Sequence, residues 1–434
     1  MNNPDIIVVG AGIAGLIVAR ELSQAGLRVT ILEARERCGG RIHTFSKNEF
    51  PVAAESGAEF IHGKLKETIR LLKQYGISYS PIKGEMIQRR NGSFVKNSGF
   101  VSDHPRLLSK KLKALETDIT VNDFLAQHFS GEEFLVLRKQ VTSFVEGYDG
   151  ADPARASTFS LREEWMKSNR KQYRVDGGYG SLIAALEADC TRAGCAFHFS
   201  KELKSVSWKV DAVEMHCTDE TRFVSRVAVI TVPLGILQSG AISFHPALPE
   251  EKESALRQLG FGEVMKILLY FDHAFWKDES VAERTGKKFD RLGFLFSDEI
   301  IPTWWTQYPN DVPLLTGWVG GSAAKLLSAQ TDELILDQAM RVLATVFETT
   351  APAIHRHLVS WKVMNWTSDP YSRGAYTYAT VDGARHIDIL GRPVENTLFF
   401  AGELFAPEAG IGLVEAAIVS GFGTAKAVLE AQKR

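Results

Sequence analysis

The sequence lacks the features that mark several classes of protein. Its four cysteines, Cys38, Cys190, Cys195 and Cys217, form no CxxC pair and no His-rich spacing, so we predict reduced structural thiols and no metal site. No apolar run reaches the roughly 18 residues that a membrane-spanning helix needs, and no basic segment precedes the apolar run at Ile6. These absences predict a cytoplasmic protein without a membrane partner.

The chain also lacks a large excess of positive or negative charge. The chain has 50 Lys+Arg against 52 Asp+Glu, a net charge of −2, so no global field attracts a phosphate backbone. We therefore expect no nucleic-acid partner. A hydrophobic content of 45% is typical of a folded globular protein, and 434 residues suit two domains.

The N-terminal segment alternates between strand and helix patterns. Residues 5–9 form a β-branched run, residues 13–25 carry apolar side chains at helical spacing, and residues 28–32 return to a strand pattern. A strand, helix and strand within about thirty residues predict a βαβ unit with parallel strands. The chain therefore starts with a Rossmann-like half.

A G-x-G-x-x-G motif lies between the first strand and the helix. Gly10 permits the tight turn, Gly12 lets a pyrophosphate approach the backbone, and Gly15 lets helix and strand pack closely. Glu33 ends the second strand, where an acid accepts hydrogen bonds from ribose hydroxyls and repels a 2′-phosphate. The alternative is a plain turn with a surface acid. The three glycines and Glu33 stand at the expected places relative to the strands and the helix, which favours a dinucleotide site.

The segment from Glu33 to Arg41 resembles the flavoprotein pattern of amine oxidases, in which an acid precedes a Gly-Gly-Arg turn. The resemblance implies FAD rather than a generic dinucleotide, with contacts from Arg35, Gly40 and Arg41, the last to the phosphates. The alternative for Arg41 is a surface arginine that balances Glu33 and Glu36.

Further motifs along most of the chain resemble the flavin-containing amine oxidase family, which includes monoamine oxidases, polyamine oxidases and lysine-specific histone demethylases. Residues 57–63 are similar to the segment that passes the flavin ring. That likeness implies cofactor contacts from Ala58 and Glu59, and it places His62 in the substrate tunnel.

Residues 260–272 resemble the family strand that carries a lysine near flavin N5, which implies that Lys266 assists reoxidation by O₂. The residues themselves point to an unusual setting. An uncompensated ammonium is costly inside an apolar strand, so Lys266 should reach a water, an acid or the cofactor. The alternative is an exposed lysine on an edge strand.

Residues 366–377 resemble the stretch that supplies one wall of the aromatic cage around the amine, and Tyr376 matches the cage position. An aromatic face attracts an amine while it is charged and orients it once it is neutral. Core packing is the alternative for Tyr376, Tyr378 and Trp366.

Residues 396–421 are similar to the family's closing signature. The likeness implies that Glu403 contacts the nucleotide and that a helix opening near Gly412, with Val414, directs its dipole at the flavin. Val206 matches the position of a backbone contact to the adenine.

Two positions depart from the family pattern. Ala375 replaces the cysteine that attaches FAD in monoamine oxidases, so we expect non-covalent FAD. Leu413 stands where many members have a second cage aromatic. Either Trp304 and Trp305 supply the missing face, or they are a buried pair in the core.

The predicted fold is α/β, with a Rossmann-like FAD-binding domain interleaved with a mixed α+β substrate-binding domain. We assign residues 1–66, 176–255 and 367–434 to the FAD-binding domain, and residues 67–175 and 256–366 to the substrate-binding domain.

The resemblance implies an amine oxidase that passes hydride from the amine α-carbon to flavin N5, gives an imine, and returns the electrons to O₂ as H₂O₂. Its partners would be a small-molecule amine and O₂, and the chain would be a monomer or homodimer. Three alternatives stay open: an amino-acid oxidase, a desaturase, or a flavin-holding protein without turnover.

Overall fold

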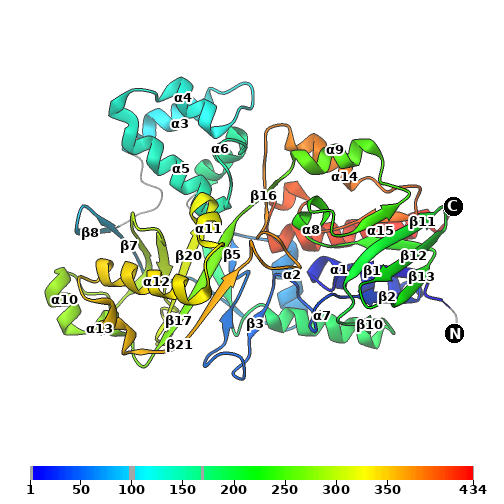
Figure 1. Ribbon diagram of the computed structural model, residues 1–434, viewed down its shortest axis with the longest axis horizontal. Helices are drawn as coiled ribbons and strands as arrows, with labels where there is room; N and C mark the ends of the chain where they lie inside the picture. The colour runs from blue at the N-terminus through cyan, green and yellow to red at the C-terminus, as the bar shows by residue number, and fades with distance from the viewer. Residues whose placement is uncertain (1–2, 97–102, 168–170, 434) are drawn as a thin grey trace.

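The computed structural model describes residues 3–96, 103–167 and 171–433. Figure 1 shows two halves side by side, a parallel-sheet half that carries both ends of the chain and a half built on a mainly antiparallel sheet with a helical lobe above it. The parallel sheet has the strand order β10-β2-β1-β14-β23. Its strands are β1 (Ile6–Val9), β2 (Val29–Leu32), β10 (Ala196–His198), β14 (Val227–Ile230) and β23 (Leu398–Phe400).

Side chains on the parallel sheet alternate between two apolar layers. On β1, Ile6 and Val8 belong to the core beneath the helices, whereas Ile7 and Val9 belong to the core on the opposite face. Successive strand residues point to opposite faces, so a strand covered on both sides is apolar throughout. This double burial explains the continuous β-branched run at the start of the chain.

Three helices cover one face of this sheet and a second sheet covers the other. The helices are α1 (Ile13–Gln24), α7 (Gly180–Arg192) and α15 (Val414–Ala431). The second sheet has the order β13-β12-β11-β15, formed by β11 (Leu203–Lys209), β12 (Ala212–Cys217), β13 (Arg222–Ser225) and β15 (Ser243–His245).

The other half is built on a seven-stranded sheet with the order β21-β17-β20-β19-β18-β7-β8. Its strands are β7 (Glu85–Arg90), β8 (Ser93–Lys96), β17 (Val264–Phe271), β18 (Leu292–Phe296), β19 (Thr303–Trp305), β20 (Leu314–Gly320) and β21 (Leu358–Asn365). Strand β17 pairs with β20 on one side and β21 on the other. The accompanying helices are α10 (Glu279–Thr285), α11 (Gly321–Leu327), α12 (Asp332–Val346) and α13 (Ala351–His355).

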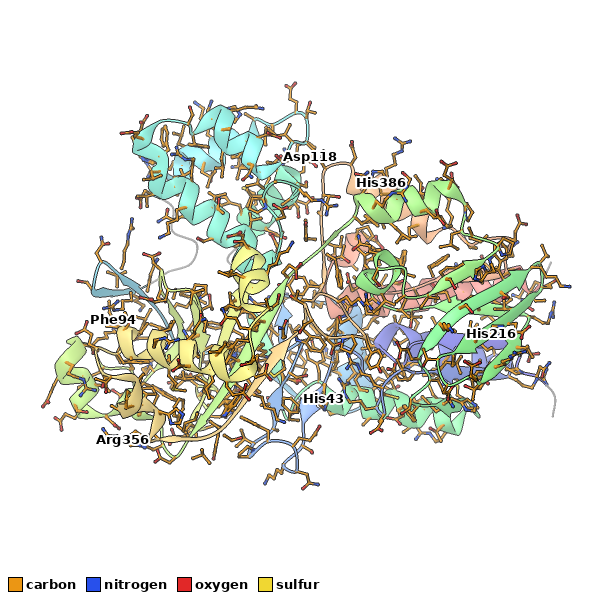
Figure 2. The ribbon with its side chains drawn as sticks, in the orientation of Figure 1. His43, Phe94, Asp118, His216, Arg356 and His386 are labelled. Atoms are coloured by element: carbon orange, nitrogen blue, oxygen red, sulfur yellow. The ribbon has the colours of Figure 1, made fainter. Side chains whose placement is uncertain are left out.

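The helical lobe comprises α3 (Pro105–Lys113), α4 (Val121–His128), α5 (Leu135–Asp149) and α6 (Thr158–Lys167) around its own apolar core. Figure 2 labels Asp118 in this lobe, opposite His386 and His216 of the parallel-sheet half. The Asp118 carboxylate accepts hydrogen bonds from the hydroxyls of Ser157 and Thr158 and from the N–H of Phe159. It thereby satisfies donors at the start of α6.

Short elements connect the two halves. The strands are β3 (Thr44–Phe45) with β4 (Ala54–Glu55), β9 (Gln172–Val175) between β5 (Phe60–His62) and β6 (Tyr79–Pro81), and β16 (Gly260–Phe261) with β22 (Thr377–Tyr378). The remaining helices are α2 (Lys66–Gln74), α8 (Leu234–Gln238), α9 (Glu250–Gln258) and α14 (Gly383–Gly391). Among the described residues, none of the helices is long and apolar enough to cross a membrane.

The predicted Rossmann-like start is confirmed, since strands at 6–9 and 29–32 flank the helix at 13–24 in parallel register. Strands β7 and β8 lie within residues 67–175, which the sequence assigned to the substrate-binding domain. There β7 and β8 extend the seven-stranded sheet instead of joining the helical lobe. The edge strand β8 is mostly exposed, whereas β7, which carries Glu85, Arg89 and Arg90, is partly buried between β8 and β18.

Helix α2 belongs to the core of the parallel-sheet half. Leu71 and Leu72 are fully buried against α15 and its neighbours, although the predicted division at residue 66 gives this helix to the substrate-binding domain. Leu65 at the N-cap of α2 has no side-chain oxygen. The carboxylate of Glu415, on α15, serves as the cap instead. It accepts hydrogen bonds from the N–H groups of Glu67 and Thr68 at 2.8 and 2.7 Å.

The Glu415→Ala variant is expected to lose about 2 kcal/mol of unfolding free energy, because one buried and one partly buried N–H group lose a charged acceptor. Chemical denaturation measures the effect. Glu430→Ala on the exposed face of α15 is the control and should change stability by less than about 0.5 kcal/mol. Equal midpoints for Glu415→Ala and wild type would contradict this role.

Candidate active site

A single large cavity of about 1550 Å³ runs from the parallel sheet to the seven-stranded sheet and the helical lobe. This volume exceeds the roughly 300–1,000 Å³ of an ordinary ligand pocket, so a large cofactor and a second molecule both fit. Most predicted site residues line the cavity: Gly10, Gly12, Glu33, Arg35, Gly40, Arg41, Ala58, Glu59, His62, Lys266, Tyr376, Glu403 and Val414.

The glycine turn has the geometry that a pyrophosphate requires. Gly10 has φ +103°, a conformation that side chains disfavour, and a Cβ on Gly15 would lie 2.0 Å from the Gly10 carbonyl oxygen. Gly12 differs, because a Cβ there would meet no atom within 4 Å. Gly12 also precedes α1 without a side-chain cap, so the first N–H groups of the helix face the cavity unpaired by any cap.

Glu33 is buried at the end of β2 and holds two loops together. Its carboxylate oxygens accept the N–H of Ala11 at 2.7 Å and the N–H of Arg35 at 2.8 Å. Each oxygen has a further lone pair, which can accept a ribose hydroxyl. The Arg35 guanidinium pairs with Asp369 at 2.5 Å and stacks on Tyr371, so this arginine ties the turn to the segment before Tyr376.

Arg41 and Glu403 meet where the closing signature returns to the cavity. The Arg41 guanidinium donates to Glu403 at 3.0 Å and to the carbonyl of Ala375 at 2.7 Å. Glu403 is 6% exposed and also accepts from Thr377 and from the N–H of Gly412. The pair therefore joins segments more than 300 residues apart along one wall.

The Arg41→Ala variant is expected to fold but to purify largely without flavin, because a cationic donor on the cavity wall is lost while Glu403 keeps its other donors. The ratio of visible to ultraviolet absorbance of the purified protein measures the effect. Arg28→Ala removes an exposed arginine paired with Asp5 and should keep its flavin. Full flavin retention in Arg41→Ala would refute the phosphate contact.

Helix α15 begins at Val414, two residues beyond the predicted opening near Gly412. Its N-cap residue, Leu413, provides no side-chain oxygen, and Leu413 and Val414 line the cavity. The positive end of the helix dipole thus faces the cavity, where it stabilises negative charge.

The predicted backbone contact of Val206 to the adenine stays a prediction. Val206 is fully buried inside the four-stranded sheet, where it pairs with Met215 and Phe244, and it is not among the described residues that line the cavity. Leu203, at the start of the same strand, lines it instead.

Lys266 lies on a central strand, not on an edge, and its side chain is 1% exposed. Its ammonium donates to Glu59 at 2.7 Å and to the Gly57 carbonyl at 3.3 Å. The expectation that Lys266 reaches a water, an acid or the cofactor is confirmed for an acid. That acid is Glu59, for which the family resemblance implied a cofactor contact. Glu59 also accepts from Arg174 at 2.9 Å and from the indole of Trp305 at 3.0 Å.

The Glu59 carboxylate is strongly stabilised in its charged form. Burial alone would raise its pKa, but the charges of Lys266 and Arg174, with hydrogen bonds from Lys266 and Trp305, lower the pKa to about 2. Glu59 is therefore an anion at any physiological pH.

An aromatic wall faces the cavity beside Lys266. The rings of Tyr376 and Trp318 are nearly parallel, 15° apart, with centroids separated by 6.5 Å. The Trp318 indole donates to the Gly147 carbonyl and the Tyr376 hydroxyl to the Tyr148 carbonyl, each at 2.7 Å. Two consecutive carbonyls at the end of α5 therefore fix both rings, since the last carbonyls of a helix lack partners within it.

Trp318 is the functional candidate that sequence reasoning missed. It is the one large aromatic in β20 and is directly opposite Lys266 in the strand pairing. Trp304 and Trp305, the tryptophans that the sequence offered for this role, lie in different places. Trp304 is fully buried and bonded to the Ile301 carbonyl, whereas Trp305 lines the cavity, as alternation along β19 requires.

His62 lines the cavity next to the helical lobe. Its Nδ1 lies 3.4 Å from the Tyr148 hydroxyl, and burial lowers the pKa of the imidazole to about 4. His62 is therefore neutral at neutral pH, where it donates or accepts a hydrogen bond without adding charge to the cavity.

The four cysteines are all buried, and none lines the cavity. A separate cluster joins Asp272, His273 and His357, whose ligand atoms lie within 4.8 Å of one another. The carboxylate of Asp272 already accepts a hydrogen bond from each imidazole, and none of the three residues lines the cavity.

The cavity fits FAD by the chemistry of its lining. An open glycine backbone and two helix N-termini without side-chain caps suit phosphates and an electron-rich ring. Glu33 suits a ribose, and Arg41 suits a phosphate.

Known proteins resemble the chain over nearly its whole length. The model of the flavin-containing amine oxidoreductase family matches residues 13–429. Mouse lysine-specific histone demethylase 1B is 27% identical over 93% of this chain, and Arabidopsis thaliana polyamine oxidase 2 is 27% identical over 93% of this chain and 83% of its own length. The chain spans about half the length of the mouse demethylase and 29% of Arabidopsis lysine-specific histone demethylase 1 homolog 3.

Solved structures share the fold. Cyclohexylamine oxidase from Brevibacterium oxydans superimposes with a TM-score of 0.80 at 20% identity over 100% of both chains. Wild-type putrescine oxidase bound to putrescine superimposes with a TM-score of 0.78 at 20% identity over 99% of both. With the family match over residues 13–429, these findings show that the chain belongs to the flavin-containing amine oxidoreductase family.

Proposed function

We propose that this protein is an FAD-dependent amine oxidase that acts on a small-molecule amine with O₂ as electron acceptor. Bound FAD would accept hydride from the amine α-carbon at N5, leaving an imine, and would return the electrons to O₂ as H₂O₂. The observation that carries the proposal is the continuity of one cavity, which leads from the glycine turn past Lys266 to the aromatic pair Tyr376 and Trp318.

The protein's own groups would bind and orient the amine. The faces of Tyr376 and Trp318 that line the cavity attract a charged amine and offer it an aromatic wall once it is neutral. The cavity also contains His62, which is uncharged at neutral pH and so does not repel a cation. No protein base is required if the amine arrives deprotonated.

We further propose that FAD is held without a covalent bond, because Ala375 offers no thiol and no cysteine lines the cavity. Acid precipitation should release the flavin into the supernatant; yellow protein in the pellet would contradict this. A cytoplasmic location and a monomeric or homodimeric state stay predictions.

The deciding experiment follows bleaching of the visible flavin band under anaerobic conditions with monoamines, diamines, polyamines, cyclic amines and amino acids. Fast bleaching by one amine class, followed by H₂O₂ when air is admitted, is the expected result. Bleaching only by amino acids would favour an amino-acid oxidase. A bound flavin that no compound in the panel reduces would contradict oxidation of amines.

A further inference from the structure

Glu59 is the acceptor for four side chains that converge from different parts of the fold. One oxygen accepts from Lys266 at 2.7 Å, and the other accepts from Arg174, Trp305 and Gln307 at 2.9, 3.0 and 3.4 Å. The Lys266, Glu59 and Arg174 side chains are 1%, 6% and 15% exposed. A carboxylate that bridges two cations is therefore buried beside the cavity.

Arg174 is held independently of the lysine. It lies on β9, donates a second hydrogen bond to the Thr306 carbonyl at 3.0 Å, and its guanidinium stacks over Phe60 at 5.0 Å. These contacts fix the guanidinium against Glu59 in the planar geometry that arginine favours. Its position does not depend on Lys266.

The charges in this cluster do not cancel. Lys266 and Arg174 supply two positive charges and Glu59 supplies one negative charge, which leaves an excess of one positive charge. Glu55, which accepts the Tyr179 N–H, also lies within the electrostatic reach of Lys266. Burial raises the pKa of Glu55 to about 7, so this carboxyl is largely uncharged below neutral pH.

We propose that Arg174 is a positioning residue for Lys266: it shares Glu59 with the lysine, so the carboxylate orients the buried ammonium without neutralising the site. A Lys266–Glu59 pair alone would be neutral as a whole, and its field would fall off steeply. With Arg174 present, the cluster offers a net positive charge to anionic species in the cavity, the reduced cofactor among them. This inference rests on the proposed flavin enzyme, in which Lys266 lies beside the flavin.

Sulfite titration of the flavin-loaded enzyme tests the proposal without turnover. Sulfite adds reversibly to oxidised flavin and bleaches its visible band, and nearby positive charge strengthens this binding of an anion. At a pH about one unit below the pKa of Glu55, Arg174→Gln should raise the sulfite Kd on the order of tenfold, the effect of one lost charge at an effective dielectric constant near 20.

Arg174→Lys restores the charge and should return the sulfite Kd to within about threefold of the wild-type value. Lys266→Met, which removes the same charge, should raise the Kd at least as much as Arg174→Gln. Arg226→Gln removes an exposed arginine paired with Asp211 and should leave the Kd unchanged. Thermal denaturation of each variant checks that it is folded.

A wild-type Kd in Arg174→Gln, together with a raised Kd in Lys266→Met, would overturn the role of Arg174 while leaving the proposed function intact. A raised Kd in Arg174→Lys equal to that of Arg174→Gln would also overturn it, because the charge would then not be what matters. A wild-type protein that retains no flavin would instead contradict the proposed function.

Discussion

Replacing Glu59 with glutamine is expected to destabilise the apoprotein by about 3 kcal/mol at neutral pH. The substitution preserves shape but leaves the buried ammonium of Lys266 and the guanidinium of Arg174 without a counter-charge. Removal of one partner from a buried ion pair strands the others in a medium of low dielectric constant. Chemical denaturation of wild type and variant measures the difference.

The pH dependence of stability gives the same prediction a second test. The folded pKa of Glu59 is about 2, below its ordinary value of 4.5, so its ionised form stabilises the fold. That contribution, roughly 3 kcal/mol, is fully present above about pH 4.5 and is lost as the pH falls towards 2. Glu59→Gln should lose less stability than wild type over this window.

Glu430→Gln is the control for both measurements, because Glu430 forms only an exposed pair with Lys426. Its stability should stay within about 0.5 kcal/mol of wild type. Equal denaturation midpoints for Glu59→Gln and wild type at neutral pH would contradict the role of Glu59 as the buried counter-charge.

The Lys266→Met variant is expected to slow reoxidation of the reduced flavin by O₂ about 100-fold, while reduction by the amine changes little. Methionine preserves the apolar stem on β17, and Glu59 keeps Arg174 as a partner, so the fold should tolerate the change. The loss is electrostatic, because a preorganised cation no longer stabilises the negative charge that develops on O₂; removal of one such group typically slows a reaction 10²–10³-fold.

Stopped-flow mixing of anaerobically reduced enzyme with oxygenated buffer measures this rate. Lys266→Arg retains a positive charge and should recover part of it. An unchanged reoxidation rate in Lys266→Met would remove Lys266 from the oxidative half-reaction. Slowed reduction with normal reoxidation would assign it to the amine side of the reaction instead.

The sequence by itself determined the first βαβ unit of the parallel-sheet half and the glycine turn within it. The signals there are local: a β-branched strand, three glycines and an acid at fixed spacing specify strand, turn and helix within about thirty residues. The structure agrees within a residue or two at β1, α1 and β2, and it brings Glu33 and Arg41 to the same cavity. Lys266 and Tyr376, which the family motifs further along the chain named, both line the same cavity.

Only the tertiary structure decided which partners those residues have. Glu59 and Lys266 are 207 positions apart, and no local pattern says that Arg174 shares the same carboxylate. Trp318 joins Tyr376 because two carbonyls at the end of α5 hold both rings. The Val206 side chain is buried where the two neighbouring strands pair with β11. The spacing of residue types along the chain predicts a helix or strand and the faces it presents. The partners of buried charges and of stacked rings depend instead on contacts in space between elements that are distant in the sequence.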